Sequence, residues 1–190
     1  MNEPVVLHVD KDIVLKQLQW SDASSIFVTI STQREHLGKW LPFVEFTREL
    51  TDSEKYVNSV IHAPEDKFEY VFCILKEGNF AGLIGFKDTD RQNLKSEMGY
   101  WLSEKYLKQG IITKSVKTLC TFAFEKMGMN RLQIRCAVAN YSSKKIPQRL
   151  SFTFEGIERD GELLSGGVFT DLEVYSLLKS EFASESGTPH

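Results

Sequence analysis

The chain has 190 residues, 42% of them apolar, and a formal net charge of −3. This length and apolar content suffice for one substantial core, so we expect a single domain over residues 1–180 and a disordered, polar tail over residues 181–190. The slightly acidic balance gives no general attraction to nucleic acid or to anionic membranes, and we expect neither as a partner. The sequence also lacks a leader pattern at its start and any apolar run of membrane-spanning length, which predicts a cytoplasmic protein.

The cysteines indicate packing rather than chemistry. Cys73, Cys120 and Cys136 are an odd number, and each lies in an apolar pattern without a histidine at metal-binding spacing. We therefore expect core positions for all three and no metal site.

The first third of the chain is predicted to form a strand and two helices. The strand covers residues 13–18, and Ser21-Asp22 is an N-cap for a helix that continues to about Gln33. The second helix begins at Thr51-Asp52-Ser53-Glu54, which has the spacing of a capping box and precedes an apolar stripe.

An aromatic loop separates these two helices, over residues 37–43. Its Trp40 and Phe43 either line the core, which is the commoner fate of such residues, or form a wall of a substrate pocket.

Three strands follow and form an antiparallel meander. They cover residues 68–75, 80–87 and 96–102, and the first two are joined by a hairpin turn at residues 76–79.

The stretch from Lys105 to Phe124 is the most unusual part of the chain, because it contains four lysines and no acidic residue. Its second half has helical periodicity, opens at Gly110 and stops at Gly128. Helix first turns normally attract Asp or Glu, so an external anion is a candidate for that place. Gly110 allows close approach to the backbone, and the amides from Gly110 to Thr113 would then hold a phosphate. The alternative is a solvated lysine face with no ligand.

A strand at residues 131–139 follows this helix. Strand, helix and strand then form a parallel pair with a right-handed crossover, and ligands collect at the carboxyl ends of such strands. Further along we expect a short helix at about residues 143–150 and strands at 152–157 and 171–178. The sequence therefore predicts an α/β fold whose mixed sheet is antiparallel early and parallel at its centre.

Four linked motifs closely resemble the GNAT acetyltransferases, and within them the RimJ/RimL branch. They are the strand Glu97–Leu102 with its G-Y-W-L, the loop Gln109–Thr113, the turn Asn140–Ser143 and the segment Leu150–Gly156. The resemblance extends from about Ile13 to Leu178. It implies the GNAT fold, with helices flanking a central mixed sheet.

The resemblance also implies where acetyl-CoA binds. Pantetheine would lie along the strand after Glu97, pyrophosphate would meet the loop amides, and Asn140 would bond the pantetheine. The implied cofactor-binding residues are Met98, Gly99, Tyr100, Trp101, Leu102, Lys108, Gln109, Gly110, Ile111, Ile112, Thr113, Asn140 and Ser143.

The chemistry of a thioester attacked by an amine requires an oxyanion donor, a base and an acid. The backbone N–H near Met98 or Gly99 is the expected oxyanion donor. Many family members use a tyrosine on the short helix as the acid, but Pro147 stands at that position. The resemblance assigns this role to Ser143 instead, which could equally be a helix N-cap. It assigns the base to Glu162. The alternatives are Asp160, two residues earlier, and Glu97, beside the CoA strand, and each of the three could equally be a surface acid.

The expected function is an acetyl-CoA-dependent N-acetyltransferase that acts on the N-terminal α-amine of a protein, such as a ribosomal protein. Trp40, Phe43 and Glu97 are the expected substrate-binding residues, and a homodimer would fit the family. The alternatives are a small-molecule N-acetyltransferase for a polyamine, antibiotic or amino acid, and a non-catalytic acyl-CoA-binding module. The acceptor site discriminates between the first two, since a polyamine site needs several converging carboxylates and a peptide site needs an open groove.

Overall fold

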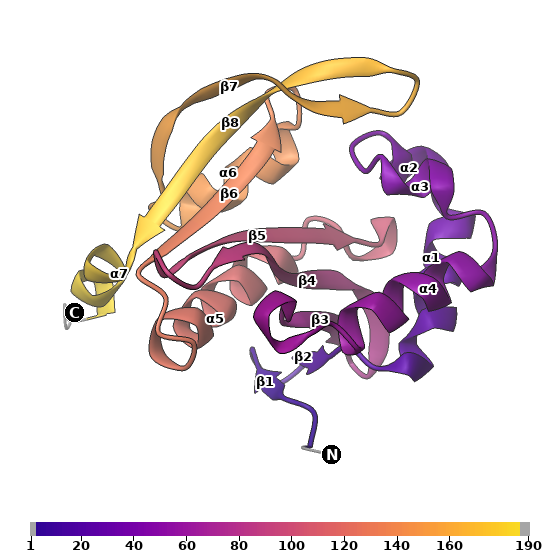
Figure 1. Cartoon of the computed structure of the whole chain (residues 1–190), viewed down its shortest axis with the longest axis horizontal. Coiled ribbons are helices and arrows are strands. Elements are labelled where there is room, and N and C mark those ends of the chain that lie inside the picture. The colour runs from indigo at the N-terminus through magenta and orange to yellow at the C-terminus, as the bar shows by residue number, and fades with distance from the viewer. Residues whose placement is uncertain (1–2, 187–190) are drawn as a thin grey trace.

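The structure is a computed structural model that describes residues 3–186. Within this range, eight strands form one sheet in the order β1-β2-β3-β4-β5-β6-β8-β7 (Figure 1). The strands are β1 (Val6–His8), β2 (Ile13–Gln17), β3 (Val71–Lys76), β4 (Asn79–Asp90), β5 (Lys95–Leu102), β6 (Arg131–Ala137), β7 (Thr153–Leu164) and β8 (Val168–Leu178). The predicted antiparallel meander is β3, β4 and β5. The short β1 was not predicted.

The centre of the sheet holds its parallel pair, as predicted. β5 and β6 run parallel and are joined through helix α5 (Ile111–Glu125), whereas all other neighbouring pairs are antiparallel. The parallel pairing covers only Lys95–Glu97 against Arg131–Gln133. Beyond it, β5 continues along β4 and β6 continues along β8, so the two strands part (Figure 1). We call residues 98–102 and 134–137 the divergent segment.

Helices cover both faces of the sheet and divide the core in two. One core holds Met98, Leu132 and Ile134 against Val116 and other residues of α5. The other holds Leu83 and Trp101 against α1 (Ala23–Thr32) and α4 (Leu50–Ile61). Because successive strand residues alternate in direction, Tyr100 shares the face of α5, while Glu97 and Gly99 share the opposite face.

The predicted aromatic loop is partly helical. Helix α2 (Arg34–Gly38) extends into it, and α3 (Phe43–Phe46) begins at its last residue. The Arg34 guanidinium donates to the carbonyls of Val44, at 2.7 Å, and of Thr47, which ties the two short helices together. These long-range bonds leave no signal in a local pattern. Single turns of 3₁₀ helix lie at Trp20–Asp22, Glu65–Lys67 and Glu104–Tyr106.

Two helix starts differ from their predicted positions. The capping residue of α4 is Glu49, and the Asp52 carboxylate accepts the N–H groups of Arg48 and Glu49 at 2.9 and 3.0 Å. The predicted box at residues 51–54 is therefore wrong by two positions, since E-x-x-D competes there with T-x-x-E. Helix α6 (Tyr141–Arg149) begins earlier than residue 143, because Asn140 is its N-cap.

The last strands are longer than predicted and form one hairpin. β8 pairs with β6 on one edge and with β7 on the other, which extends its pairing well before residue 171. Helix α7 (Lys179–Ser186) then occupies the start of the segment predicted to be disordered. The Glu181 carboxylate accepts the N–H of Leu178 at 2.8 Å, and the Phe182 ring lies 5.3 Å from that of Phe124. Residues 187–190 of the predicted tail lie outside the described residues. Between residues 3 and 186, no helix is long and apolar enough to cross a membrane.

Candidate active site

The loop before α5 has the backbone geometry of an anion site. Lys108 and Gly110 both have left-handed φ values, of 60° and 73°, and the loop between them is exposed. A Cβ placed on Gly110 would meet nothing within 4 Å, so the space above the helix start is open. The first N–H groups of α5 have no acceptor within the helix, as at every helix start. Left-handed turns of this kind direct successive N–H groups into one concavity, which suits a phosphate.

The side chains around this loop agree with an anionic ligand. The first turn of α5 contains no acidic residue. The hydroxyl oxygen of Thr113 is buried and has no hydrogen-bond partner, which is costly unless a ligand supplies one. Lys114 is not available to a phosphate in this state, because its ammonium bonds the Asp10 carboxylate at 2.7 Å. This hydrogen bond lowers the pKa of Asp10 to about 2. The chain thus fits acetyl-CoA through the loop amides and Thr113.

Strand β5 offers its backbone to a ligand and few of its side chains. Met98, Trp101 and Leu102 are buried in the two cores. After Glu97, the edge of β5 that faces β6 has no strand partner, so its N–H and C=O groups remain for a ligand. The N–H of Met98 or Gly99, expected to meet the oxyanion, lies at the start of this edge.

The start of α6 places Asn140 and Ser143 beside β5. Asn140 Oδ1 accepts the N–H of Ser143 at 3.1 Å, so Asn140 has the capping role that was the alternative for Ser143. The Ser143 hydroxyl oxygen lies 3.2 Å from the Tyr100 hydroxyl and is thus not used as a cap. Pro147, the position at which a tyrosine acid was expected from the resemblance, is buried inside α6. Ser143 thus places a hydroxyl next to the divergent segment.

Glu97 lies at the centre of a cluster of charged residues on the face of the sheet opposite α5. It is only 6% exposed, and its two oxygens bond Lys87 Nζ at 2.8 Å and Arg135 Nε at 2.6 Å. Arg135 also bonds Glu158 on β7 at 3.0 Å. One arginine therefore joins β5, β6 and β7 where the first two strands begin to part. Both carboxylate oxygens of Glu97 are therefore already bonded to cations.

Glu162 lies near the same cluster but has no partner. Its side chain is half-buried on β7, and its carboxylate forms no ion pair and no hydrogen bond among the described residues. Burial raises the pKa of Glu162, against the lowering effect of Lys87 and Arg135. A carboxylate with a raised pKa and free oxygens has the properties of a proton acceptor. Asp160, the other carboxylate considered, is exposed.

The two aromatic residues of the predicted substrate pocket are at the surface. Trp40 is half-buried under the Lys39 ammonium, which lies 5.1 Å from its ring centroid, and Phe43 is 41% exposed. Neither belongs to the described cores. The turn of the β7–β8 hairpin adds exposed Val168 and Phe169, and the register places this turn beyond the carboxyl end of β6. In Figure 1 it lies at the same end of the sheet as α2 and α3.

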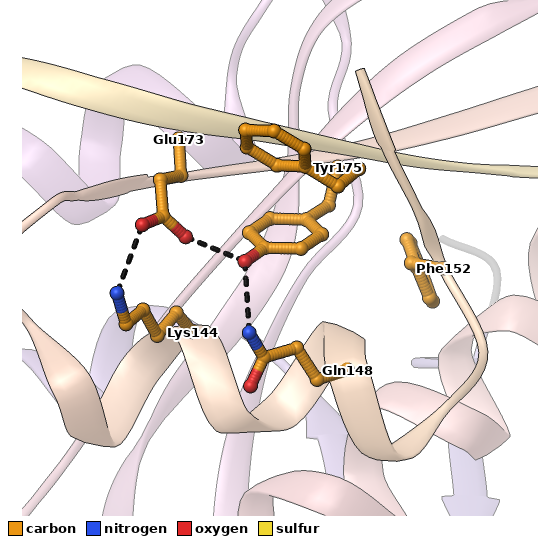
Figure 2. A pocket seen from close by; sticks show the side chains of 6 residues that line it. Lys144, Gln148, Phe152, Glu173 and Tyr175 are labelled. Carbon is orange, nitrogen blue, oxygen red and sulfur yellow. Dashed lines mark hydrogen bonds and ion pairs between the residues drawn. The ribbon is translucent and has the colours of Figure 1, made fainter. Parts of the chain in front are cut away.

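One depression in the described structure lies away from these residues. It has a volume of about 440 Å³ and lies between α6 and the β7–β8 hairpin (Figure 2). Its polar side chains satisfy one another: Lys144 bonds Glu173 at 2.8 Å, Tyr175 donates to Glu173 at 2.5 Å, and Gln148 donates to Tyr175 at 3.1 Å. Phe152 and Phe154 complete the wall. Apart from Phe152, which lies in a recognised motif, no sequence signal indicated this depression. Among residues 3–186, no group of potential ligands is placed to hold a metal.

Comparison with known proteins identifies the family. A model of the acetyltransferase (GNAT) domain matches residues 12–153. YdaF of Bacillus subtilis (strain 168), whose name makes it a candidate ribosomal N-acetyltransferase, is 34% identical over 183 residues, which are 93% of this chain and 97% of that protein. The ribosomal-protein-serine acetyltransferase of Escherichia coli (strain K12) is 25% identical over 90% of this chain and 94% of its own length.

A solved structure shows the same fold. RimL, a ribosomal L7/L12 α-N-protein acetyltransferase in complex with coenzyme A, superposes with a TM-score of 0.88. It is 22% identical, and the match covers 93% of this chain and 99% of that one.

A charge test at Gly110 examines the phosphate loop. Asn and Asp have the same shape and both tolerate a left-handed φ, so Gly110→Asn and Gly110→Asp differ essentially in one negative charge. We expect the Asp variant to bind CoA at least about 10-fold more weakly than the Asn variant, because its carboxylate lies against the pyrophosphate. Isothermal titration calorimetry with CoA measures this. Equal CoA affinities of the two variants would contradict the assignment of a phosphate site to this loop.

The buried Glu97 should also be a large contributor to stability. Glu97→Gln removes the buried charge that Lys87 and Arg135 both bond, and we expect the free energy of unfolding to fall by about 2 kcal/mol. Glu77→Gln is the matched control, because Glu77 pairs with Lys76 at 3.1 Å but its side chain is 68% exposed. Its effect should stay below about 0.5 kcal/mol. Urea unfolding measures the free energy of unfolding of both variants. Similar losses of this free energy in the two would contradict the role given to Glu97.

Proposed function

The chain belongs to the GNAT acetyltransferase family and is an acetyl-CoA-dependent N-acetyltransferase, and from this premise we propose that its acceptor is the N-terminal α-amine of a protein such as a ribosomal protein. Support comes from the two curated relatives, which match almost end to end and carry ribosomal-protein names. A ribosomal acceptor also implies work in the cytoplasm.

One observation carries the choice of acceptor: the charged cluster leaves a single carboxylate free. Glu97 and Glu158 are held by Arg135, so of these three glutamates only Glu162 offers its oxygens to an incoming amine. A polyamine has several cationic groups and needs several free carboxylates, whereas a protein N-terminus has one cationic group. Exposed Trp40 and Phe43 then suit the side chains that follow the first residue of a peptide.

The proposed reaction proceeds by direct attack within a ternary complex. The neutral amine attacks the acetyl carbonyl carbon, and a backbone N–H at Met98 or Gly99 stabilises the oxyanion. The C–N bond forms and the C–S bond breaks, with the electron pair going to sulfur. Glu162 takes the ammonium proton, directly or through water, and Ser143 gives a proton to the thiolate. An α-amine with a pKa near ~8 is easier to deprotonate than a lysine near ~10.4, which favours N-terminal acceptors.

Acceptor preference tests the proposed function. We expect CoA release from acetyl-CoA with short peptides that have a free N-terminal Ser or Ala. The matched control is the same peptides with a blocked N-terminus and an internal lysine, and a second pool contains polyamines and aminoglycosides. Mass spectrometry locates the acetyl group. Turnover on the small amines alone, or on none of the pools, would contradict the proposed acceptor.

Removing the charge of Glu162 should separate activity from stability. Glu162→Gln is expected to lower kcat by about 100-fold, because the ammonium loses its proton acceptor. Burial raises the folded-state pKa of Glu162, so its ionised form weakens the fold above that pKa. The Glu162→Gln variant should therefore unfold at an unchanged or higher temperature at neutral pH, and this difference should vanish as the pH falls and Glu162 becomes protonated.

The control for this variant is Glu125→Gln, at an exposed position at the end of α5, which should change neither property. Wild-type kcat in the Glu162→Gln variant would exclude Glu162 as the base. Steady-state kinetics and thermal unfolding between pH 4 and 8 provide both readouts.

A further inference from the structure

Pro147 leaves one carbonyl of α6 without its helical donor. In an α-helix the N–H of each residue bonds the carbonyl four residues before it, and proline has no N–H. The affected carbonyl is that of Ser143. The hydroxyl of Tyr100, on β5, lies 3.3 Å from this oxygen and donates to it. A side chain from the central sheet thus replaces the missing helical bond.

The same phenol contacts the side chain of Ser143. The two hydroxyl oxygens are 3.2 Å apart. Either hydroxyl can be the donor in this contact, so the Ser143 proton is not committed to Tyr100. The N–H of Ser143 is bonded by Asn140 at 3.1 Å. Three contacts from two elements therefore fix the position of this serine and keep its hydroxyl on the side of β5.

The place of this contact is the one where a thioester would lie. Tyr100 is three residues beyond Glu97, the last residue of β5 that pairs with β6. It therefore lies in the divergent segment, and Ser143 remains partly exposed. Burial raises the pKa of Tyr100 above its usual range, so the phenol keeps its proton and stays a donor at every working pH.

We propose that Tyr100 is a positioning residue of the transferase, which holds the Ser143 hydroxyl where it gives its proton to the departing CoA thiolate. The inference rests on the proposed function, because it needs Ser143 as the acid. When the C–S bond breaks, the electron pair goes to sulfur. The Ser143 proton moves from oxygen to sulfur to form the CoA thiol. The nitrogen loses a proton as the amide forms, and this proton returns through water to Ser143.

A double-mutant cycle tests the proposal with Tyr100→Phe, Ser143→Ala and the combined variant. We expect Tyr100→Phe to lower kcat by about 10-fold or more, while KM for acetyl-CoA and Kd for CoA change by less than about 3-fold. The combined variant should be no slower than Ser143→Ala, because Tyr100 acts only through that serine.

Tyr175→Phe is the matched control. Tyr175 is another buried tyrosine on the same face of the sheet, and its hydroxyl bonds Glu173 and Gln148 rather than Ser143 (Figure 2). Its kcat should stay within about 2-fold of wild type, since it lies outside the reacting groups.

The outcomes separate the two proposals. Suppose that the wild-type enzyme acetylates a peptide. The role of Tyr100 is then overturned, and the function stands, if Tyr100→Phe has wild-type kcat. The same conclusion follows if the fold-losses in kcat of Tyr100→Phe and Ser143→Ala multiply in the combined variant. If Tyr100→Phe loses CoA affinity by the same factor as kcat, Tyr100 only supports the fold. This result also overturns the positioning role. If the wild-type enzyme transfers no acetyl group to any acceptor, the proposed function fails and the inference fails with it.

Discussion

The parting of β5 and β6 is the constraint on which the rest of this structure depends. The two strands share only three residue pairs, and each then follows its other neighbour. The parting leaves the N–H and C=O groups along one edge of β5, from Met98 onward, without a strand partner. Such unpaired backbone groups cost free energy when they are buried away from water. Arg135 holds this point, because it bonds buried Glu97 on one side and Glu158 on the other. A charge network that joins β5, β6 and β7 thus lies where the opening begins.

The same network explains why one carboxylate differs from its neighbours. Two cations, Lys87 and Arg135, are already engaged by Glu97, so Glu162 is left with desolvation and only distant attraction. An unpaired, half-buried carboxylate weakens a fold, and such groups persist mainly where chemistry needs them. The two glutamates therefore differ: the paired Glu97 joins the strands, whereas the oxygens of Glu162 are not engaged, as the proposed role of a base requires.

The sequence predicted the parts of this fold that have local causes. The helix start at Gly110, the meander and the crossover follow from periodicity and from a single glycine, and the linked motifs brought Asn140 and Ser143 to one place. It missed whatever depends on contacts distant in sequence. The Asp10–Lys114 pair, the bonds from Arg34 that order α3, and the engagement of Glu97 by Arg135 join residues that no spacing rule connects. The resemblance indicated that Pro147 stands where many family members have a tyrosine acid. The hydrogen bond from Tyr100 to the Ser143 carbonyl could not be predicted, because it depends on where β5 lies relative to α6.

This hydrogen bond links a helix defect to the chemistry. A proline within α6 removes a hydrogen bond and would ordinarily destabilise the helix. Here the uncompensated carbonyl belongs to Ser143, and the donor that satisfies it, Tyr100, comes from the strand whose edge is open. A helix residue with an N–H at position 147 would satisfy this carbonyl internally and remove the need for the phenol. The proline at this position therefore makes the Ser143 carbonyl dependent on the Tyr100 phenol, which also contacts the Ser143 hydroxyl.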